Sequence, residues 1–366
     1  MPGVSTGYKQ ELYFGNEPTG TYGSAVPVAK AMGLVQSIDP TETSNIIKIR
    51  TMGGTRDYSN LVPGRFEING SFEYLIQEGN FLRQAFGDDS GVSTTDGGPR
   101  TIAGGGGGST YLHVLGSSST PDANSFPSFT LEFTDQESSA SKSLKRIYSG
   151  CRADTLAISA TLDAPVTARV DYIGQKVEIS TADATAVTSP TVDPYVFYQG
   201  HMYLTSGAIS GQSAVTGTVC ELNNFDFTLN NNLEAVYYIC GTNRPWQSKR
   251  SLKELIPKGR DMEGRVTLNF SDKDQYERFL GAAAATTPQD TITKFQTVLD
   301  FARTGGPTGT ASTNDWMRLV LNSCAFDSAN IGGSPEDVVT EEYTLFVESG
   351  KCYVLDDYSS SYSSNE

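Results

Sequence analysis

The sequence predicts a mainly β protein built from two tandem copies of one domain. Gly (37 residues), Tyr (18) and Phe (17) are abundant, and long runs of Leu, Ala, Glu and Lys are missing, a balance that favours strands and turns. Residues 61–87 read LVPGRFEINGSFEYLIQEGNFLRQAFG, and residues 255–281 repeat that pattern without a gap as LIPKGRDMEGRVTLNFSDKDQYERFLG. With 366 residues, the chain is long enough for two domains.

The first half begins with an extended arm and continues into a strand-rich domain. Residues 1–39 are mixed in polarity and rich in Gly and Pro, which suits an arm that packs across another part of the molecule. From residue 45, NIIKIRTMGGTRD predicts a strand that ends in a Gly-Gly turn. In the repeated block, Phe66, Ile68 and Phe72 alternate with polar residues, so one face of this strand is expected on a core and the other in water. The segment QEGNFLRQAFG then predicts a short helix closed by Gly87.

Residues 88–127 are a Gly/Ser-rich insertion into this first domain, which spans residues 40–180. The insertion has little apolar content to order it. Strand patterns resume in SFTLEFTD, RADTLAISATLD and VTARVDYIGQKVEIS. Residues 181–224 are expected to be a linker with connecting strands.

The second half repeats the order of the first. The segment NLEAVYYICGT (232–242) matches NIIKIRTMGGT (45–55) at an offset of 187, and the opening block recurs at an offset of 194. VTEEYTLF (339–346) matches VTARVDYI (166–173) at an offset of 173, as Cys324 matches Cys151. Two unrelated hairpins can look alike because alternation and turn glycines are common, but three blocks in one order favour duplication. The second domain is placed at 225–357, followed by a flexible tail at 358–366.

The composition argues against several classes of function. A net charge of −15 and a pI near 4.6 disfavour a protein that wraps phosphates with Lys and Arg. Five widely spread cysteines without a C-x-x-C pair, and only two histidines, predict buried thiols rather than a zinc site. No stretch approaches the roughly 20 apolar residues that span a bilayer, and the first residues lack the apolar centre of a secretory signal. We expect a chain made and folded in the cytoplasm, without membrane insertion.

No catalytic or cofactor motif stands out. Five glycines at 104–108 lead into STYLHV without the Lys that a phosphate-binding loop needs, and H-E-x-x-H does not occur. His113 and His201 are expected to be ordinary loop or strand-end residues. The two carboxylates of a glycosidase can lie anywhere in a sequence, but nothing here singles out a pair. We therefore predict no enzyme activity, no cofactor and no metal site.

Taken together, these patterns resemble the major tail tube proteins of tailed phages and archaeal viruses. The resemblance covers roughly residues 40–180 and 225–355. It rests on a strand entering a Gly-Thr turn, a polar loop with L-[VI]-P, an alternating acid-x-x-Gly strand, a short helix ending in FLRQAFG or YERFLG, and a later strand pair around VTARVDYI. It implies two tandem β-sandwich or half-barrel tube domains, each with one short α-helix, whose inner sheets join into a large β-barrel on oligomerisation.

The resemblance also implies a structural virion protein of the tail, assembled in the host cytoplasm. Single-copy members form hexameric rings, so a duplicated member is expected to form a homotrimeric, pseudo-hexameric ring that stacks into the channel for DNA ejection. The implied partners are further copies of the chain, the tape measure protein and viral DNA in the lumen, and the tail terminator and baseplate or tip proteins. The residues leave open one alternative, a carbohydrate-binding or adhesive β-sandwich protein.

Two groups of residues are the candidate sites under this resemblance. The polar face of the repeated strand would line the lumen, where acids repel the DNA backbone; its candidates are Glu67, Glu73, Asp261 and Glu263. The basic loop of the second copy, with Trp246 as a buried anchor, would contact the adjacent ring; its candidates are Arg244, Trp246, Lys249, Arg250, Lys253 and Lys258. The plainer interpretations are solvated strand residues and a solvated hairpin loop that contacts nothing.

Overall fold

The computed structural model confirms a mainly β protein, with 58% strand and 5% helix. It describes residues 10–18, 22–52, 54, 56–87, 89, 100–103, 109–116, 126–135, 144–180, 185–206, 209, 215, 217–238, 250–304, 315–334, 338–359 and 361–362.

In the part of the first half that the structure describes there are eleven strands and one short α-helix. They are β1 (Gln10–Asn16), β2 (Leu34–Thr43), β3 (Ile47–Ile49), β4 (Asn60–Val62), β5 (Glu67–Leu75), α1 (Arg83–Phe86), β6 (Arg100–Ala103), β7 (Ser109–Leu115), β8 (Phe129–Asp135), β9 (Leu144–Thr161), β10 (Thr167–Gly174) and β11 (Lys176–Ser180).

Among the described residues, the second half contributes nine strands, one α-helix and one 3-10 helix. They are η3 (Phe197–Gln199), β12 (Gly200–Thr205), β13 (Thr218–Cys220), β14 (Leu222–Asn230), β15 (Glu234–Val236), β16 (Glu254–Ile256), β17 (Asp261–Asn269), α2 (Asp274–Phe279), β18 (Phe295–Thr304), β19 (Asp315–Gly332) and β20 (Thr340–Asp356).

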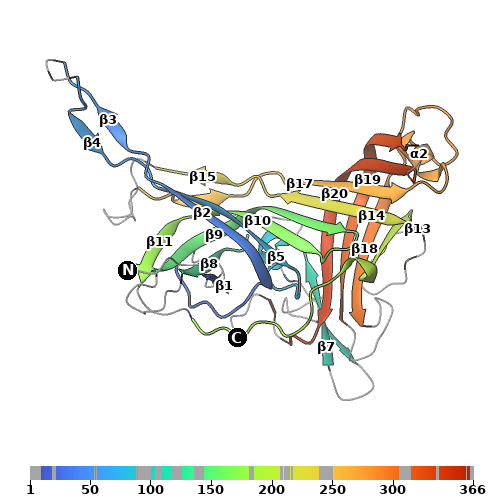
Figure 1. Ribbon diagram of the computed structural model, residues 1–366, viewed down its shortest axis with the longest axis horizontal. Coiled ribbons are helices and arrows are strands. Elements are labelled where there is room, and N and C mark those ends of the chain that lie inside the picture. The colour runs from blue at the N-terminus through green and yellow to red at the C-terminus, as the bar shows by residue number, and fades with distance from the viewer. Residues whose placement is uncertain are drawn as a thin grey trace.

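One antiparallel sheet runs across both halves, in the order β2-β5-β10-β9-β14-β17-β20-β19 (Figure 1). We call these eight strands the main sheet. Beneath it, β1, β8, β11 and the first part of β9 form a second layer. The other half also has a second layer. It consists of β12, β18, the first part of β19 and the last part of β20. Strands as long as β9 and β19 belong to both layers because they bend, at Gly150 (φ 64°) and at Ser323 (φ 54°).

The second half reproduces the register of the first. In the first half Ile38 on β2 pairs with Phe72 on β5, and in the second half Phe225 on β14 pairs with Val266 on β17. These are the offsets of 187 and 194 seen in the sequence. A β-bulge follows Val35 on β2 and recurs after its counterpart Leu222 on β14. We therefore call β2–β11 the first repeat and β14–β20 the second.

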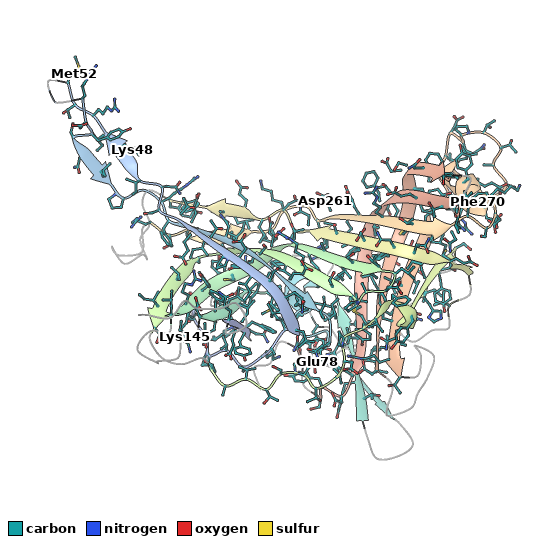
Figure 2. All side chains as sticks on the ribbon, in the orientation of Figure 1. Lys48, Met52, Glu78, Lys145, Asp261 and Phe270 are labelled. Atoms are coloured by element: carbon teal, nitrogen blue, oxygen red, sulfur yellow. The ribbon has the colours of Figure 1, made fainter. Side chains whose placement is uncertain are left out.

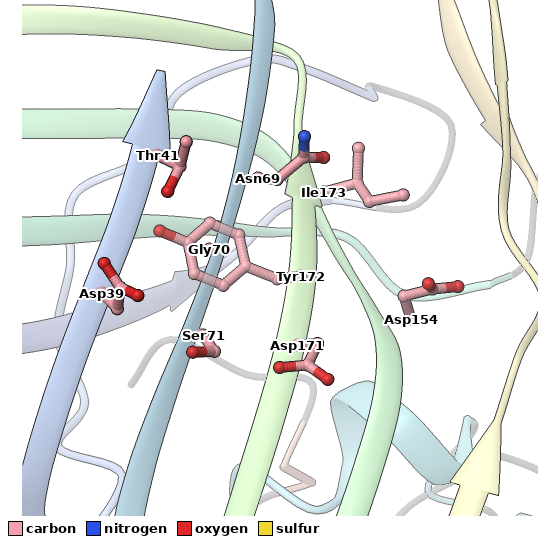
Figure 3. Close-up of a pocket in the computed structure, with 9 residues that line it drawn as sticks. All are labelled: Asp39, Thr41, Asn69, Gly70, Ser71, Asp154, Asp171, Tyr172 and Ile173. Carbon is pink, nitrogen blue, oxygen red and sulfur yellow. The ribbon is translucent and has the colours of Figure 1, made fainter. Parts of the chain in front are cut away.

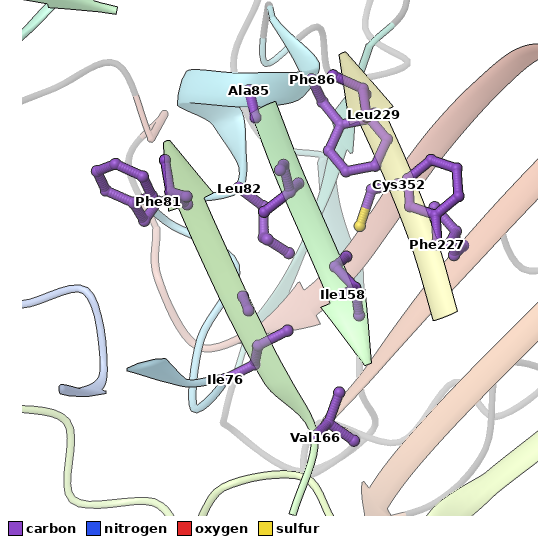
Figure 4. Close-up of a cluster of buried hydrophobic side chains, with 14 of the residues drawn as sticks. Ile76, Phe81, Leu82, Ala85, Phe86, Ile158, Val166, Phe227, Leu229 and Cys352 are labelled. Atoms are coloured by element: carbon purple, nitrogen blue, oxygen red, sulfur yellow. The ribbon is translucent and has the colours of Figure 1, made fainter. Parts of the chain in front are cut away.

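The two repeats share one hydrophobic core instead of forming separate ones. Phe86 from α1 stacks on Phe227 from β14, with ring centroids 6.2 Å apart and planes 7° from parallel. Around this contact, Ile158 of β9 and Cys352 of β20 are buried in the same cluster (Figure 4). Burying so much apolar surface across the boundary holds the repeats as one body.

Three expectations from the sequence do not hold for residues that the structure describes. The insertion at 88–127 contains a hairpin of β6 and β7, and β7 pairs with β20 of the second repeat. The tail at 358–366, expected to be flexible, packs at Tyr362, whose side chain is buried and stacks 3.7 Å from His113. His113 is accordingly a buried strand residue and not a loop residue, because Asp89 and Asp356 supply polar partners that the surrounding sequence does not reveal.

Candidate functional site

The main sheet has a face that points away from the core, which we call the polar face. Directly paired residues of adjacent strands lie on the same side of a sheet, so the register assigns each side chain to a face. All four acids expected to line a lumen lie on the polar face: Glu67 and Glu73 on β5, and Asp261 and Glu263 on β17. The polar face also carries Asp39, Asp171, Asp226, Glu342, Arg169 and Arg265. Among these named residues, eight acids outnumber two arginines, which makes their sum on this face net negative.

Two of the four acids also have a structural role at the start of a hairpin. Asn45 and Asn232 adopt the left-handed conformation, with φ of 40° and 48°. The Asn45 amide donates to Glu67 at 2.8 Å, and the Asn232 amide donates to Asp261 at 2.7 Å. Left-handed Asn is stabilised by local hydrogen bonds of this kind, so Glu67 and Asp261 hold the chain where it leaves the main sheet.

A shallow hollow of about 350 Å³ opens on the polar face of the first repeat (Figure 3). Asp39, Asp154 and Asp171 line it together with Tyr172 and polar residues of β5. A second hollow, of about 330 Å³, lies at the related place beside Thr228 and Phe346. Within the described residues no cluster of His, Cys, Asp and Glu has the arrangement of a metal site.

The hairpins that follow Asn45 and Asn232 differ in their surroundings. The β15–β16 hairpin lies along the first repeat, where the Arg152 guanidinium donates to the carbonyl of Leu255 and the Gln175 amide donates to that of Lys253 at 2.8 Å. The β3–β4 hairpin projects away from the body, with Lys48 and Met52 on it (Figure 2). Leu255 is fully buried, whereas its counterpart Leu61 is 58% exposed.

The basic loop of the second repeat is only partly within the described residues. Arg244, Trp246 and Lys249 lie outside them. Arg250 bonds to the first repeat of its own chain. Its guanidinium donates to the carbonyl of Gly64 at 2.7 Å and to the hydroxyl of Ser44 at 2.7 Å. The remaining two candidates have neighbours on their own hairpin: Lys253 lies over the ring of Tyr238 and Lys258 pairs with Glu234.

The ends of the main sheet are the feature that sequence patterns did not reveal. Within the described residues β2 pairs only with β5, and the last part of β19 pairs only with β20. Both segments are largely exposed, including Thr41 and Thr43 on β2 and Asn330 and Ile331 on β19. A strand edge with unpaired N–H and C=O groups is a template for another strand. Alternation in VQSIDPTET could have identified a strand there, but not its position at an edge.

The cysteines are apolar packing residues in the part of the chain that the structure describes. Cys151, Cys324 and Cys352 are buried and Cys220 is half-buried, all as free thiols. Burial raises the pKa of Cys324 to about 11 and the pKa values of Cys220 and Cys352 to about 12. Such thiols stay protonated at neutral pH and are poor nucleophiles. No helix among the described residues is long and apolar enough to cross a membrane.

A sheet with two exposed edges, a projecting apolar hairpin and an acidic face defines a class of protein: structural β proteins that assemble with other subunits. The comparison with protein families places the chain within that class. The family model described as phage tail tube protein matches residues 4–345, nearly the whole chain, and the protein belongs to this family. It is a structural component of the virion tail. No curated protein matches the chain.

Proposed function

We propose that three copies of this chain close into a ring, that the rings stack into a tube, and that the polar face lines the channel through which DNA passes into the host. The chain arose by domain duplication, and the ring contains six similar repeats. The single observation that supports this best is the junction of β9 with β14, where two repeats join edge to edge in one continuous sheet. The edges that remain exposed, β2 and β19, are the counterparts of the two strands in that junction.

Ring size follows from the number of strands per chain. Each chain contributes eight strands to the main sheet. With strands about 4.8 Å apart and tilted by about 40°, a barrel of roughly 24 strands is about 48 Å across its backbone, and one of roughly 16 strands about 32 Å. Side chains that point inward reduce the inner diameter of each barrel by about 10 Å. A two-chain ring would then be barely as wide as a DNA duplex, whereas a three-chain ring leaves room for it.

The charge of the polar face supports DNA passage without retention. Lys and Arg neutralise phosphates in proteins that hold DNA, so a wall with excess acids repels the duplex and lets it slide. The same channel would contain the tape measure protein before ejection. The role needs no catalysis and no cofactor, and assembly takes place in the host cytoplasm.

Contacts between rings are assigned to the β3–β4 hairpin and to the basic loop of the second repeat. The hairpin exposes apolar side chains that a single chain does not cover: Ile46, Ile47, Ile49, Met52, Tyr58 and Leu61. Surfaces of this kind mark protein interfaces. Arg244, Trp246 and Lys249 remain candidates for the same contact, and the tail terminator and baseplate or tip proteins would meet the end rings.

Negative-stain electron microscopy of the purified chain at increasing concentration tests the proposal. We expect rings and then tubes of one diameter, and a mass of three chains for the smallest ring by light scattering. Monomers that persist at high concentration, or that bind immobilised carbohydrate, would contradict it and favour an adhesive β-sandwich.

A further inference from the structure

The β9–β14 junction specifies a register that can be carried to the ends of the main sheet. Positions on β2 and β14 differ by 187, as the pairs Ile38–Phe72 and Phe225–Val266 show. Positions on β9 and β19 differ by 173, since Ser159 faces Thr167 and Gly332 faces Thr340. Every residue of the junction therefore has a defined counterpart on the two exposed edges.

The junction itself is a regular antiparallel ladder with one irregular anchor. Thr228 pairs with Ala157 and Asn230 pairs with Thr155. Asp154 lies next to this ladder, at the bulge between β9 and β10. Its backbone carbonyl accepts from the amide of Asn231 at 2.7 Å, and its carboxylate accepts from the amide of Leu233 at 2.8 Å. One Asp thus holds the strand end and the start of the next hairpin.

We infer that β2 of one chain pairs with β19 of the next chain in this same register, an inference that rests on the ring assembly proposed above. Thr41 then lies opposite Asn330, and Thr43 opposite Ser328. Asp327 occupies the position of Asp154, at the corresponding bulge between Phe326 and Ser328. Its carboxylate accepts from the backbone amide of Ile46, the counterpart of Leu233, in the next chain.

Residues in the last part of β19 are more exposed than their counterparts on β9, as expected if the strand that should pair with β19 belongs to another chain. On β9, Ile158 pairs with Phe227 of β14 and is 2% exposed, whereas its counterpart Ile331 on β19, which has no neighbouring strand on that side among the described residues, is 39% exposed. Asn45 has the same left-handed conformation as Asn232, so the chain after β2 already leaves the sheet as it does after β14. The occupant that fits both edges is a second copy of this chain, because each edge has the backbone geometry of one side of the existing junction.

The edge between chains is built to be weaker than the junction within the chain. Asn231 donates to Asp154 and the Asn223 carbonyl accepts from Leu162, so odd-numbered residues of β14 direct their backbone groups toward β9. Phe227 is one of these, and its counterpart is Pro40, which has no N–H to donate. The edge between chains lacks that one hydrogen bond. A proline at an edge also discourages pairing with unrelated strands, which suits a contact that forms only between correct partners.

Cysteine cross-linking of the full chain tests the register. Thr41 and Asn330 form a non-hydrogen-bonded pair in the inferred ladder, with Cα atoms about 4.5 Å apart, within the range that a disulfide bridges. Under mild oxidation, Thr41→Cys combined with Asn330→Cys should give a ladder on non-reducing gels that ends at three chains and collapses on reduction. The unmodified chain and each single variant are the controls. Thr41→Cys with Ile331→Cys places the thiols on opposite faces of the sheet and should give no ladder.

The outcomes separate this inference from the proposed function. Rings in the electron microscope without the Thr41–Asn330 bridge, or with the Thr41–Ile331 bridge instead, would overturn the register and leave ring assembly intact. Absence of rings would remove the proposed function itself. As an independent measurement, Asp327→Ala should raise the concentration needed for half-maximal ring formation roughly five- to tenfold, because one capping bond per contact is lost. Asp327→Asn keeps an acceptor oxygen and should stay near wild type; equal effects of both variants would contradict the capping role.

Discussion

The central glycine of the repeated block is explained by the side chain across the strand. Gly70 pairs with Tyr172, and a Cβ added to Gly70 would lie 2.6 Å from the tyrosine hydroxyl. Gly264 pairs with Leu345, and a Cβ there would lie 2.8 Å from a methyl group of that leucine. In both repeats a large side chain crosses the glycine, a close approach that no other residue permits. The glycine recurs because the packing recurs.

A second feature at this scale is the buried cluster around His113. Its two ring nitrogens lie 3.1 Å from Asp89 and 3.3 Å from Asp356, and Tyr362 stacks on its ring. Burial opposes the charged form of His113, but hydrogen bonds and charges from Asp356 and Asp89 outweigh it and raise the pKa to about 9. The cluster joins β7, β20 and the C-terminal segment.

The raised pKa predicts a defined pH dependence of stability. Because the folded pKa lies above the ordinary value of 6.5, the folded state binds the extra proton more tightly, and its contribution is complete below about pH 6.5. We expect the free energy of unfolding to fall by on the order of 3 kcal/mol as pH rises from about 6.5 through 9. Denaturant unfolding across this range measures it.

The matched variants for that measurement are His113→Gln and His201→Gln. His113→Gln should lower the stability at pH 6 and flatten the decline between pH 6.5 and 9, since the titrating group is gone. His201 is exposed on β12, so its substitution should leave the decline unchanged. A decline of equal size in all three proteins would show that His113 is not its source.

At the scale of elements, the two hairpins show what sequence patterns can and cannot predict. Alternation around Phe66 and Ile68 predicts a strand, because one face must meet a core whatever the rest of the fold. The positions of the hairpins depend on which surface is next to them. The β15–β16 hairpin packs on the first repeat of its own chain, and the Arg250 guanidinium donates hydrogen bonds to Gly64 and Ser44. That contact joins residues about 200 positions apart, and no local pattern encodes it.

The projecting hairpin gives a test of stacking between rings. Ile47→Ser combined with Ile49→Ser and Leu61→Ser removes apolar surface that is already in water in the single chain, so folding should be little affected. We expect rings to form and tubes to be lost or shortened, because that surface is no longer available to be buried between rings. Tube length in electron micrographs and the thermal unfolding midpoint of the same samples measure the two effects.

A matched control for the hairpin is Ile179→Ser on β11, an isoleucine that is 76% exposed in the second layer. It removes exposed apolar surface without touching the hairpin. Tubes of normal length in the triple variant, or equal shortening in the control, would exclude the hairpin as the contact between rings.

At the scale of the whole molecule, the main feature is that both repeats form one continuous sheet. The sequence predicts both repeats through their alternation and turn glycines, and it predicts the acids of β5 and β17 on one polar face. It does not predict that the repeats share one core, because Phe86 and Phe227 are 141 positions apart and meet only after the sheet has formed. Nor does it predict which strands end the sheet, since edge and centre differ in neighbours and not in local pattern.

The charge of the polar face yields the last prediction, which concerns the assembled tube. Glu73→Lys with Glu263→Lys changes one position in each repeat and shifts the charge of the chain by four units, while leaving Glu67 and Asp261 to hold their hairpins. Both residues are in strands whose opposite face carries the packing, so rings should still form. The eight acids and two arginines named on the polar face become six acids and four bases, so the wall is much less negative. It should hold double-stranded DNA at low salt and release it as salt rises, because binding to the lysines releases counterions from the phosphates.

The control carries the same change of charge away from the polar face. This control combines Glu178→Lys with Asp193→Lys. Glu178 lies on β11 of the second layer, and Asp193 lies in an exposed segment off the main sheet. If the polar face lines the channel, only the Glu73/Glu263 variant should retain DNA inside tubes, protected from nuclease, while the control binds it outside and unprotected. Nuclease-resistant DNA in control tubes, or none in either, would mean that the polar face is not the wall of the channel. Nuclease protection measured against salt concentration therefore distinguishes a lumen from a merely solvated face. Only a closed channel gives DNA that is both protected from nuclease and released as salt rises.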